Sequence, residues 1–435
     1  MRRITIYILV ILALAAGACE KKIDPIDPYT EDERARDILY SLMNEWYFWY
    51  KKMPVVELKD FEDPYTLVDA LRYDSLDRWS YVTDYESFMD YYAGSFAGHG
   101  IRVGLDDDDK ARIVMIYDNS PLYADSVRRG WIVNSVNGIN IAALLVAGDY
   151  EAYDAAFGPR QAGITNTFVF TRPNGTTKQV TSTKAEFTVN SVLKYDTLHL
   201  SSGVTGYLAF ESFIEPSFDE LEEAFGYFLD NDVKDLILDL RYNSGGLVDV
   251  ALELASHIAG SPRAGQVFVR QVHNDKKTQE NVTEYFKSTG YSLNVNRLAV
   301  ITTRQTASAS ELVINGLMPH IDVQCFGDTT SGKPVGYYGF TESKKLYVFL
   351  PVAFQYLNSL NYGDFYKGFA PQQYVPDDIT LDFGDRNELM LKAAIEYMET
   401  GGTKGSYQYR PQRMAPWKPE WQNNMFLGPL KTIKN

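Results

Sequence analysis

The run LILDLRYNSGG at residues 236–246 decides the fold of this 435-residue chain. Its first five residues form an apolar stretch of the length of a strand. Gly245 and Gly246 then provide a tight turn, and residues 247–259 have the apolar spacing of a helix. Adjacent glycines also let backbone N–H groups point into a cleft, although plain tight turns use them as well. The order of strand, turn and helix predicts one unit of an α/β domain.

The same alternation continues on both sides of this run. The segments that continue it are a strand at 206–210, a helix at 217–229, a strand at 298–303 and a helix at 311–317. Sheets built from such units bind their ligands outside the carboxyl ends of the strands. The residues that follow Leu240 and Thr303 are therefore the first candidates for a functional site.

The chain before this core divides into two further parts. Residues 30–92 are rich in Leu, Trp, Tyr and Phe at helical spacings, which predicts a small helical domain that begins at Thr30. We expect the aromatic residues 46–50 to pack between short helices rather than form a binding stripe. From residue 96 onwards, period-two alternation and glycines predict strands, with a short helix at 122–129.

The first residues are typical of an export signal. Arg2 and Arg3 precede the apolar stretch 4–14, and small residues lead to Cys19. The apolar stretch is shorter than the roughly 20 residues that a membrane-spanning helix needs. The residues that end at Cys19 resemble the lipobox of bacterial lipoproteins, in which this cysteine carries the lipid. The alternative is an ordinary cleaved signal with an incidental cysteine.

Composition excludes several classes of protein. A net charge of −15 would repel a phosphate backbone, so we expect no nucleic-acid partner. The histidines are scattered without zinc spacing, and the acidic run 106–109 lacks the spaced ligands and the glycine of a calcium loop, so no metal or cofactor is predicted. We interpret this run as a solvated hairpin turn. The second cysteine, Cys325, lies in a strand-like run and is interpreted as a core residue.

Two segments carry residues that could perform chemistry. Ser308 follows the strand at 298–303 at the start of a helix, where free N–H groups favour negative charge on a bound substrate. Ser308 and Glu311 also have the spacing of a capping box, which requires no catalytic role. Lys333 lies in the glycine-bounded loop 327–336. A lysine that is buried near an apolar cleft loses its charge more easily and can then accept a proton from a serine hydroxyl.

Together, the motifs around residues 239–246, 306–311 and 327–333 resemble those of the carboxyl-terminal processing peptidases, serine peptidase family S41. The resemblance covers roughly residues 98–398. It implies an α/β peptidase core with βαβ units like those of crotonase and ClpP. It also implies Ser308 as the nucleophile and Lys333 as the general base, 25 residues apart as in the family.

The resemblance further implies an oxyanion hole formed by backbone N–H groups of Ala309, Gly245 and Gly246. One departure concerns Tyr337, which stands where the family often has a glutamine that orients the lysine. A tyrosine hydroxyl could serve the same purpose. Ser310 is the alternative nucleophile and His99 the alternative base. We expect Asp239 and Arg241 to brace the loop by a charge-assisted hydrogen bond rather than to react.

Residues 98–187 resemble a PDZ domain of bacterial proteases, with Trp131 where that family usually has aspartate. PDZ domains bind peptide termini by adding a strand to a sheet edge, so a protein or peptide partner is implied. The predicted organisation is multi-domain α/β, and its parts are a signal peptide (1–18), a tether (19–30), a helical domain (31–95), a PDZ-like domain (96–188), a peptidase core (189–400) and a tail (401–435) that wraps over the body.

The function predicted from these observations is a serine endopeptidase anchored to a membrane through Cys19, periplasmic or on the cell surface. It would cleave exported proteins or peptides near their C-termini by a Ser308/Lys333 acyl-enzyme mechanism without a cofactor. The first alternative is a catalytically silent lipoprotein that binds peptides through its PDZ-like domain. A second alternative, a polysaccharide-binding surface protein, rests on the tyrosine content alone.

Overall fold

The computed structural model describes residues 29–415 and 426–433. The predicted signal peptide, Cys19 and nearly all of the predicted tether lie outside these residues. Within the described part of the chain, no helix is long and apolar enough to span a membrane.

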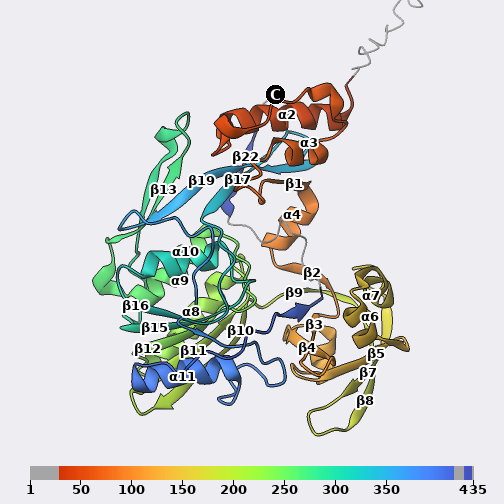
Figure 1. The fold of residues 1–435 in the computed structure, drawn as a ribbon, viewed down its shortest axis with the longest axis vertical. Helices are drawn as coiled ribbons and strands as arrows, with labels where there is room; N and C mark the ends of the chain where they lie inside the picture. The colour runs from red at the N-terminus through yellow and green to blue at the C-terminus, as the bar shows by residue number, and fades with distance from the viewer. Residues whose placement is uncertain (1–28, 416–425, 434–435) are drawn as a thin grey trace, which may run out of the picture.

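The core is a mixed sheet that is parallel except at one edge (Figure 1). Its strands in spatial order are β10 (Val192–Leu200), β11 (Gly203–Phe210), β12 (Asp235–Asp239), β15 (Arg297–Thr302), β16 (Asp322–Gly327) and β20 (Gln373–Tyr374). Only β10 runs antiparallel to its neighbour among these described strands. The α/β core predicted from the sequence is confirmed.

Helices cover both faces of this sheet because its strands alternate their side chains between two apolar layers. One face packs against α8 (Ser217–Asp230), α9 (Val248–Ala259) and α10 (Ala309–Leu317). The other face packs against α11 (Leu389–Thr400). The carboxyl ends of β12 and β15 therefore open at one edge of the core, beside the starts of α9 and α10.

A second sheet, which the sequence did not predict, covers the outer side of α9 and α10 (Figure 1). Its strands are β1 (Tyr81–Asp84), β13 (Val267–His273), β14 (Val282–Tyr285), β17 (Val335–Thr341), β18 (Tyr347–Leu350), β19 (Val352–Asn358) and β22 (Phe426–Thr432). Short 3₁₀ turns occur at Tyr50–Lys52, Leu58–Asp60, Ser261–Arg263 and Thr278–Glu280. The sheet is mainly antiparallel and draws its described strands from four separate regions of the chain.

The N-terminal region lies on this second sheet. Its helices are α2 (Glu31–Trp46), α3 (Pro64–Leu71) and α4 (Tyr85–Tyr92). Thr30 caps α2 through a reciprocal pair of hydrogen bonds with Glu33, as the predicted helix start requires. The region is not purely helical, since β1 pairs with β18. Nor do the aromatic residues pack only between helices, because the ring of Trp46 contacts Tyr338 and Phe340 of β17.

Residues 95–188 form a β-rich unit with a hydrophobic core of its own. Its elements are β2 (Ser95–Gly98), β3 (Ile101–Leu105), β4 (Ala111–Ile116), α5 (Pro121–Ala124), β5 (Ile132–Val136), β6 (Ile139–Asn140), α6 (Ile141–Ala147), α7 (Tyr150–Phe157), β7 (Thr165–Thr171), β8 (Thr177–Thr183) and β9 (Ala185–Thr188). Helix α5 is shorter than predicted because Ser126 adopts a positive φ of 65°, which is incompatible with a continuing helix.

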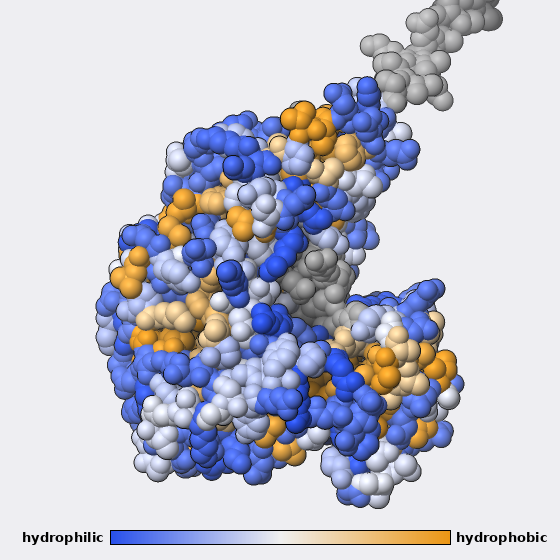
Figure 2. Space-filling view, viewed as in Figure 1, coloured by the Kyte–Doolittle hydropathy of each residue, from blue (hydrophilic) through white to orange (hydrophobic). Residues whose placement is uncertain are grey.

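The β-rich unit stands beside the core and is separated from the N-terminal layer by a hollow (Figure 2). From the C-terminal tail, the short strand β21 (Arg413–Met414) pairs with β3 at the edge of the β-rich unit. The described part of the tail therefore reaches this unit after leaving α11 in the core.

Candidate active site

Ser308 lies between the end of β15 and the start of α10, in a backbone conformation that L-residues rarely adopt. Its φ is 62° and its ψ is −113°. The side chain is fully buried, and its Oγ has no hydrogen-bond partner among the described residues. Unfavourable backbone geometry and an unpaired buried hydroxyl both cost stability. Such features are found where the chemistry of a site demands them.

The loop before Ser308 is fastened to the turn that follows β12. Thr306 Oγ1 donates to the carbonyl of Leu240 at 2.8 Å. The N–H of Ala307 and the hydroxyl of Ser310 both donate to the carbonyl of Asn243, at 3.1 and 3.0 Å. The two loops that the sequence singled out therefore form one rigid structure at the carboxyl edge of the sheet.

Glu311 connects Ser308 to the loop that carries Lys333. Its Oε2 accepts the backbone N–H groups of Ser308 and Lys333 at 2.9 and 2.8 Å, so the two residues lie side by side. Its Oε1 accepts from Thr330 Oγ1 and the N–H of Gly332. The sequence predicted only a helix cap for this residue. In the structure, Glu311 also fixes the backbones of Ser308 and Lys333 relative to each other.

Lys333 is fully buried. Loss of solvation lowers the pKa of its amine well below the ordinary value of 10.5, and the nearby Asp77 and Glu311 offset this only in part. The neutral amine is therefore much more accessible near neutral pH than in an exposed lysine. No hydrogen bond links Lys333 Nζ to Ser308 Oγ, because that hydroxyl has no partner among the described residues.

Tyr337 contacts the amine of Lys333, as its position in the sequence suggested. Lys333 Nζ donates to the Tyr337 hydroxyl at 2.9 Å, and this hydroxyl in turn donates to the carbonyl of Trp79. Trp79 belongs to the N-terminal region, just before β1. The ring of Tyr337 also lies 4.3 Å from the Lys333 amine. The N-terminal region thus takes part in fixing the lysine.

We predict that Tyr337→Phe lowers kcat by about tenfold without unfolding the protein, because the lysine loses its orienting hydrogen bond. A hydrogen bond to the ammonium form raises the pKa of a lysine, so the variant should also shift the pH–rate profile to lower pH. Rates measured across a pH series test this. A lower rate with an unmoved profile would mean that Tyr337 supports only the packing of the site.

The glycine turn lies directly against Ser308. A Cβ atom added to Gly245, whose φ is 107°, would come within 2.8 Å of Ser308 Cβ and 3.0 Å of the backbone nitrogen of Ala309. The N–H of Gly245 donates to Asn243 Oδ1 at 2.9 Å. The N–H groups of Gly246 and Ala309 donate to none of the described residues. Of the three N–H groups predicted to form the oxyanion hole, those of Gly246 and Ala309 can therefore donate to a substrate, whereas that of Gly245 already donates to Asn243.

Gly245→Ala should be severe because the new methyl group collides with Ser308 at a positive φ. We expect a loss of about 1–3 kcal/mol of stability from the strained backbone and at least about 100-fold in kcat/KM from the displaced serine. Thermal unfolding and peptidase assays measure the two effects separately. Gly401→Ala is the matched control, since that glycine also has a positive φ but meets nothing within 4 Å.

The alternative candidates occupy other environments. The Ser310 hydroxyl is committed to Asn243, as described above. His99 lies inside the β-rich unit, where its ring nitrogens contact Asn166 Oδ1 at 2.7 Å and Ser182 Oγ at 3.2 Å. Cys325 is buried, and burial raises the pKa of its thiol to about 12, which makes it inert as expected for a core residue. These contacts place neither His99 nor Cys325 beside Ser308.

A buried ion-pair network supports the turn after β12. Arg241 donates to both carboxylate oxygens of Asp239, which is the pair predicted from the sequence, and also to Asp377 and Glu388. Charge-assisted bonds of this kind are geometrically specific. Asp377, Glu388 and Trp79 were not predicted as supporting residues, because each reaches the site from a segment without a motif. Asn243 lies within the motif at 239–246, but its role in fastening the Ser308 loop was not predicted.

Comparison with known families agrees with this geometry. Residues 204–375 match the profile of peptidase family S41, and residues 34–81 match that of the peptidase S41 N-terminal domain. Together the two profiles account for half of the chain. The chain belongs to peptidase family S41, as the resemblance of its motifs indicated.

Its relatives include the carboxy-terminal processing protease CtpB of Bacillus subtilis, 27% identical over 57% of this chain. A carboxy-terminal-processing protease of Bartonella bacilliformis is 26% identical over 60% of the chain. The matches span 49% and 57% of the lengths of these two relatives. A crystal structure assigned to the S41 proteases, from Bacteroides fragilis, superimposes with a TM-score of 0.68 at 24% identity, over 83% of this chain and 96% of that one. That likeness shows a shared fold.

Proposed function

We propose that this protein is a serine endopeptidase that acts through Ser308 and Lys333. The observation that carries the proposal is that one carboxylate oxygen of Glu311 accepts the backbone N–H groups of both Ser308 and Lys333. Ser308 has a strained backbone and an unpartnered hydroxyl, and Lys333 is a buried lysine of lowered pKa. A nucleophile and a base held by a common rigid element are what acyl transfer requires.

The proposed reaction has two halves. Neutral Lys333 accepts the Ser308 proton while Oγ attacks the peptide carbonyl, and the developing oxyanion is stabilised by the N–H groups of Gly246 and Ala309. The protonated lysine then returns its proton to the leaving amine as the C–N bond breaks, which leaves an ester on Ser308. A water molecule then gives a proton to Lys333 as its oxygen attacks the ester carbonyl, and Lys333 passes that proton to Ser308 Oγ as the ester bond breaks and the acid product leaves.

Ser308 and Lys333 are both fully buried, so substrate must gain access before reaction. The described structure therefore corresponds to a closed state of the proposed enzyme. Closure keeps water away from the lysine and maintains its lowered pKa. Closure also keeps the enzyme from cutting folded proteins indiscriminately.

The β-rich unit is proposed to be a PDZ-like domain that binds the C-terminal region of a substrate protein by strand addition. Its elements follow the predicted order, and Trp131 packs in its core against Phe170. Cleavage near the C-termini of exported proteins would follow. We further propose that Cys19 carries a lipid that anchors the chain to a membrane, with the body in the periplasm or at the cell surface.

The second candidate is a silent peptide-binding lipoprotein. The observation that favours it is the absence of a hydrogen bond at Ser308 Oγ within the described residues, since a resting Ser/Lys dyad commonly shows one. Incubating the purified protein with an unfolded substrate, and identifying the fragments by mass spectrometry, separates the two. Internal cuts near the substrate's C-terminus support the peptidase. Retention of intact substrate on the protein supports the binding function.

A further inference from the structure

The tail of the chain occupies the outer edge of the β-rich unit as an added strand. Arg413 and Met414 of β21 pair antiparallel with Leu105 and Gly104 of β3. The N–H of Ala415 extends the ladder by donating to the carbonyl of Val103 at 3.0 Å. The opposite edge of β3 pairs with β4. The tail therefore fills the position that a peptide takes when it binds a domain of this kind by strand addition.

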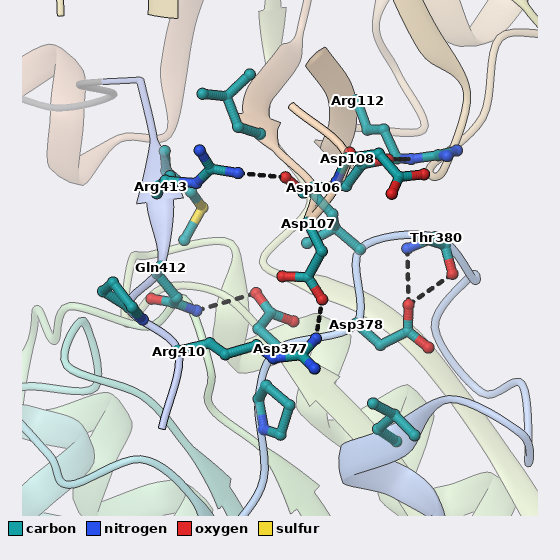
Figure 3. A pocket seen from close by; sticks show the side chains of 16 residues that line it. Asp106, Asp107, Asp108, Arg112, Asp377, Asp378, Thr380, Arg410, Gln412 and Arg413 are labelled. Carbon is teal, nitrogen blue, oxygen red and sulfur yellow. Dashed lines mark hydrogen bonds and ion pairs between the residues drawn. The ribbon is translucent and has the colours of Figure 1, made fainter. Parts of the chain in front are cut away.

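Opposite charges hold the tail at this edge. Its two arginines face the acidic hairpin loop between β3 and β4, which the sequence predicted to be merely solvated (Figure 3). Arg410 pairs with Asp107, and Arg413 pairs with Asp109 and donates to the carbonyl of Asp106. The carboxylate of Asp106 itself is engaged by Arg112. Asp108 pairs with Lys110 of the same loop, so Asp107 and Asp109 are the carboxylates of this loop that pair with the tail.

The four paired side chains are largely exposed, with between 41% and 67% of their surface accessible. Exposed ion pairs contribute little individually and are screened by salt. The tail is also attached by backbone hydrogen bonds to β3 and to Tyr374 of β20, and Ala415 is buried in the core of the β-rich unit. A second extended peptide of similar charge could make the same ion pairs and the same strand pairing.

The same segment also touches the loop that leads to Ser308. Gln412 Nε2 donates to Asp377 Oδ2 at 2.9 Å (Figure 3). Gln305 Nε2 donates to Gln412 Oε1 at 3.4 Å. Gln305 lies three residues before Ser308. An occupant of the β3 edge therefore runs beside the candidate catalytic loop, which is where a substrate of the proposed peptidase would need to lie.

We propose that residues 406–415 act as an internal ligand of the β3 edge, and that substrate peptides bind by displacing them. The edge selects extended peptides with basic side chains placed as Arg410 and Arg413 are, three positions apart, because Asp107 and Asp109 receive them. This inference rests on the proposed peptide-binding role of the β-rich unit and names the chemistry of its partner: a basic, extended peptide segment.

The test measures binding rather than activity. The probe is a fluorescent peptide with the sequence of residues 406–415, titrated by anisotropy into the full chain carrying Ser308→Ala so that it is not cut. In the same background, Arg410→Glu with Arg413→Glu weakens the internal competitor. Probe affinity should then rise about tenfold, as expected if the edge is free in one parent molecule in ten. Lys52→Glu with Lys59→Glu, an equal charge change at exposed residues of the N-terminal region, should leave affinity unchanged.

A charge exchange tests the selection itself. Asp107→Arg with Asp109→Arg should abolish preference for the basic probe over a probe with glutamate at both arginine positions. Adding Arg410→Glu and Arg413→Glu to this variant should restore the internal contact and weaken binding of both probes. Thermal unfolding confirms that each variant is folded. The inference is wrong if the variants are folded and Arg410→Glu with Arg413→Glu leaves probe affinity unchanged. It is also wrong if folded Asp107→Arg with Asp109→Arg still prefers the basic probe.

A β-rich unit that does not bind peptides would give a different result in these titrations. If no variant binds either probe, including those with the tail reversed, the β-rich unit does not recognise such peptides and both proposals fall together. If the probe binds the parent and the tail-reversed protein equally well, peptide recognition stands and only the displacement of the tail is excluded.

Discussion

Ser308→Ala is expected to lower kcat/KM for an unfolded protein substrate by about 10⁴-fold or more, which is the scale seen when the nucleophile of a serine peptidase is removed. The substitution removes one oxygen that makes no hydrogen bond to the described residues, so the fold should be unaffected. Initial rates of substrate cleavage, followed by gel or by release of a fluorescent fragment, measure the loss.

Ser310→Ala is the matched control. Its hydroxyl binds the carbonyl of Asn243 rather than facing the site, so we expect at most a modest loss of stability and near-normal turnover. If activity survives Ser308→Ala but not Ser310→Ala, then Ser310 rather than Ser308 is the nucleophile. Activity that survives both would remove the serine mechanism altogether.

Lys333→Met should have an effect of similar size on turnover, about 10³-fold or more, because the serine loses its base. Its effect on stability should have the opposite sign to that of most core substitutions. Burial lowers the pKa of Lys333 in the folded protein, so the unfolded chain binds more protons at this residue. Folding stability due to this group therefore rises with pH, and the group is destabilising below the ordinary lysine pKa of 10.5.

Methionine fills a similar volume without a charge, so Lys333→Met should raise the free energy of unfolding at neutral pH by about 0.5–2 kcal/mol. The melting temperature should rise accordingly. The gain should shrink as the pH approaches 10. Calorimetry of both proteins across this range provides the measurement, with Lys392→Met, an exposed lysine on α11, as the control. A lower melting temperature would show that the Lys333 amine is a net stabilising group and that its proposed preparation as a base is mistaken.

The sequence predicted those parts of the fold that local pattern controls. Each strand and helix of the core around Gly245 and Ser308 has its own apolar period, so these units could be identified one by one. The second sheet could not, because β1, β13 and β17 come from distant segments and pair only through tertiary contacts. The packing of Trp46 on β17 was missed for the same reason.

The sequence singled out Ser308, Lys333, Tyr337 and the Asp239–Arg241 pair, but most of the other supporting contacts of the candidate site were not predicted. Ser308 and Lys333 lie within recognisable motifs, and Tyr337 follows at a fixed spacing from the lysine. The carbonyl of Trp79 that receives the Tyr337 hydroxyl carries no side-chain signal at all. The role of Glu311 was hidden because a capping box explained its presence fully. The tail strand at β3 lacked any periodicity, so only its general course could be expected.

The proposed Ser308/Lys333 mechanism can be tested by labelling the purified protein with a serine-directed fluorophosphonate and locating the adduct by peptide mass spectrometry. In this reaction the serine oxygen displaces fluoride from phosphorus while the base takes the hydroxyl proton. We expect one adduct, on Ser308, which forms far more slowly in Lys333→Met. An adduct on another serine, or labelling of Ser308 that is indifferent to Lys333, would contradict it.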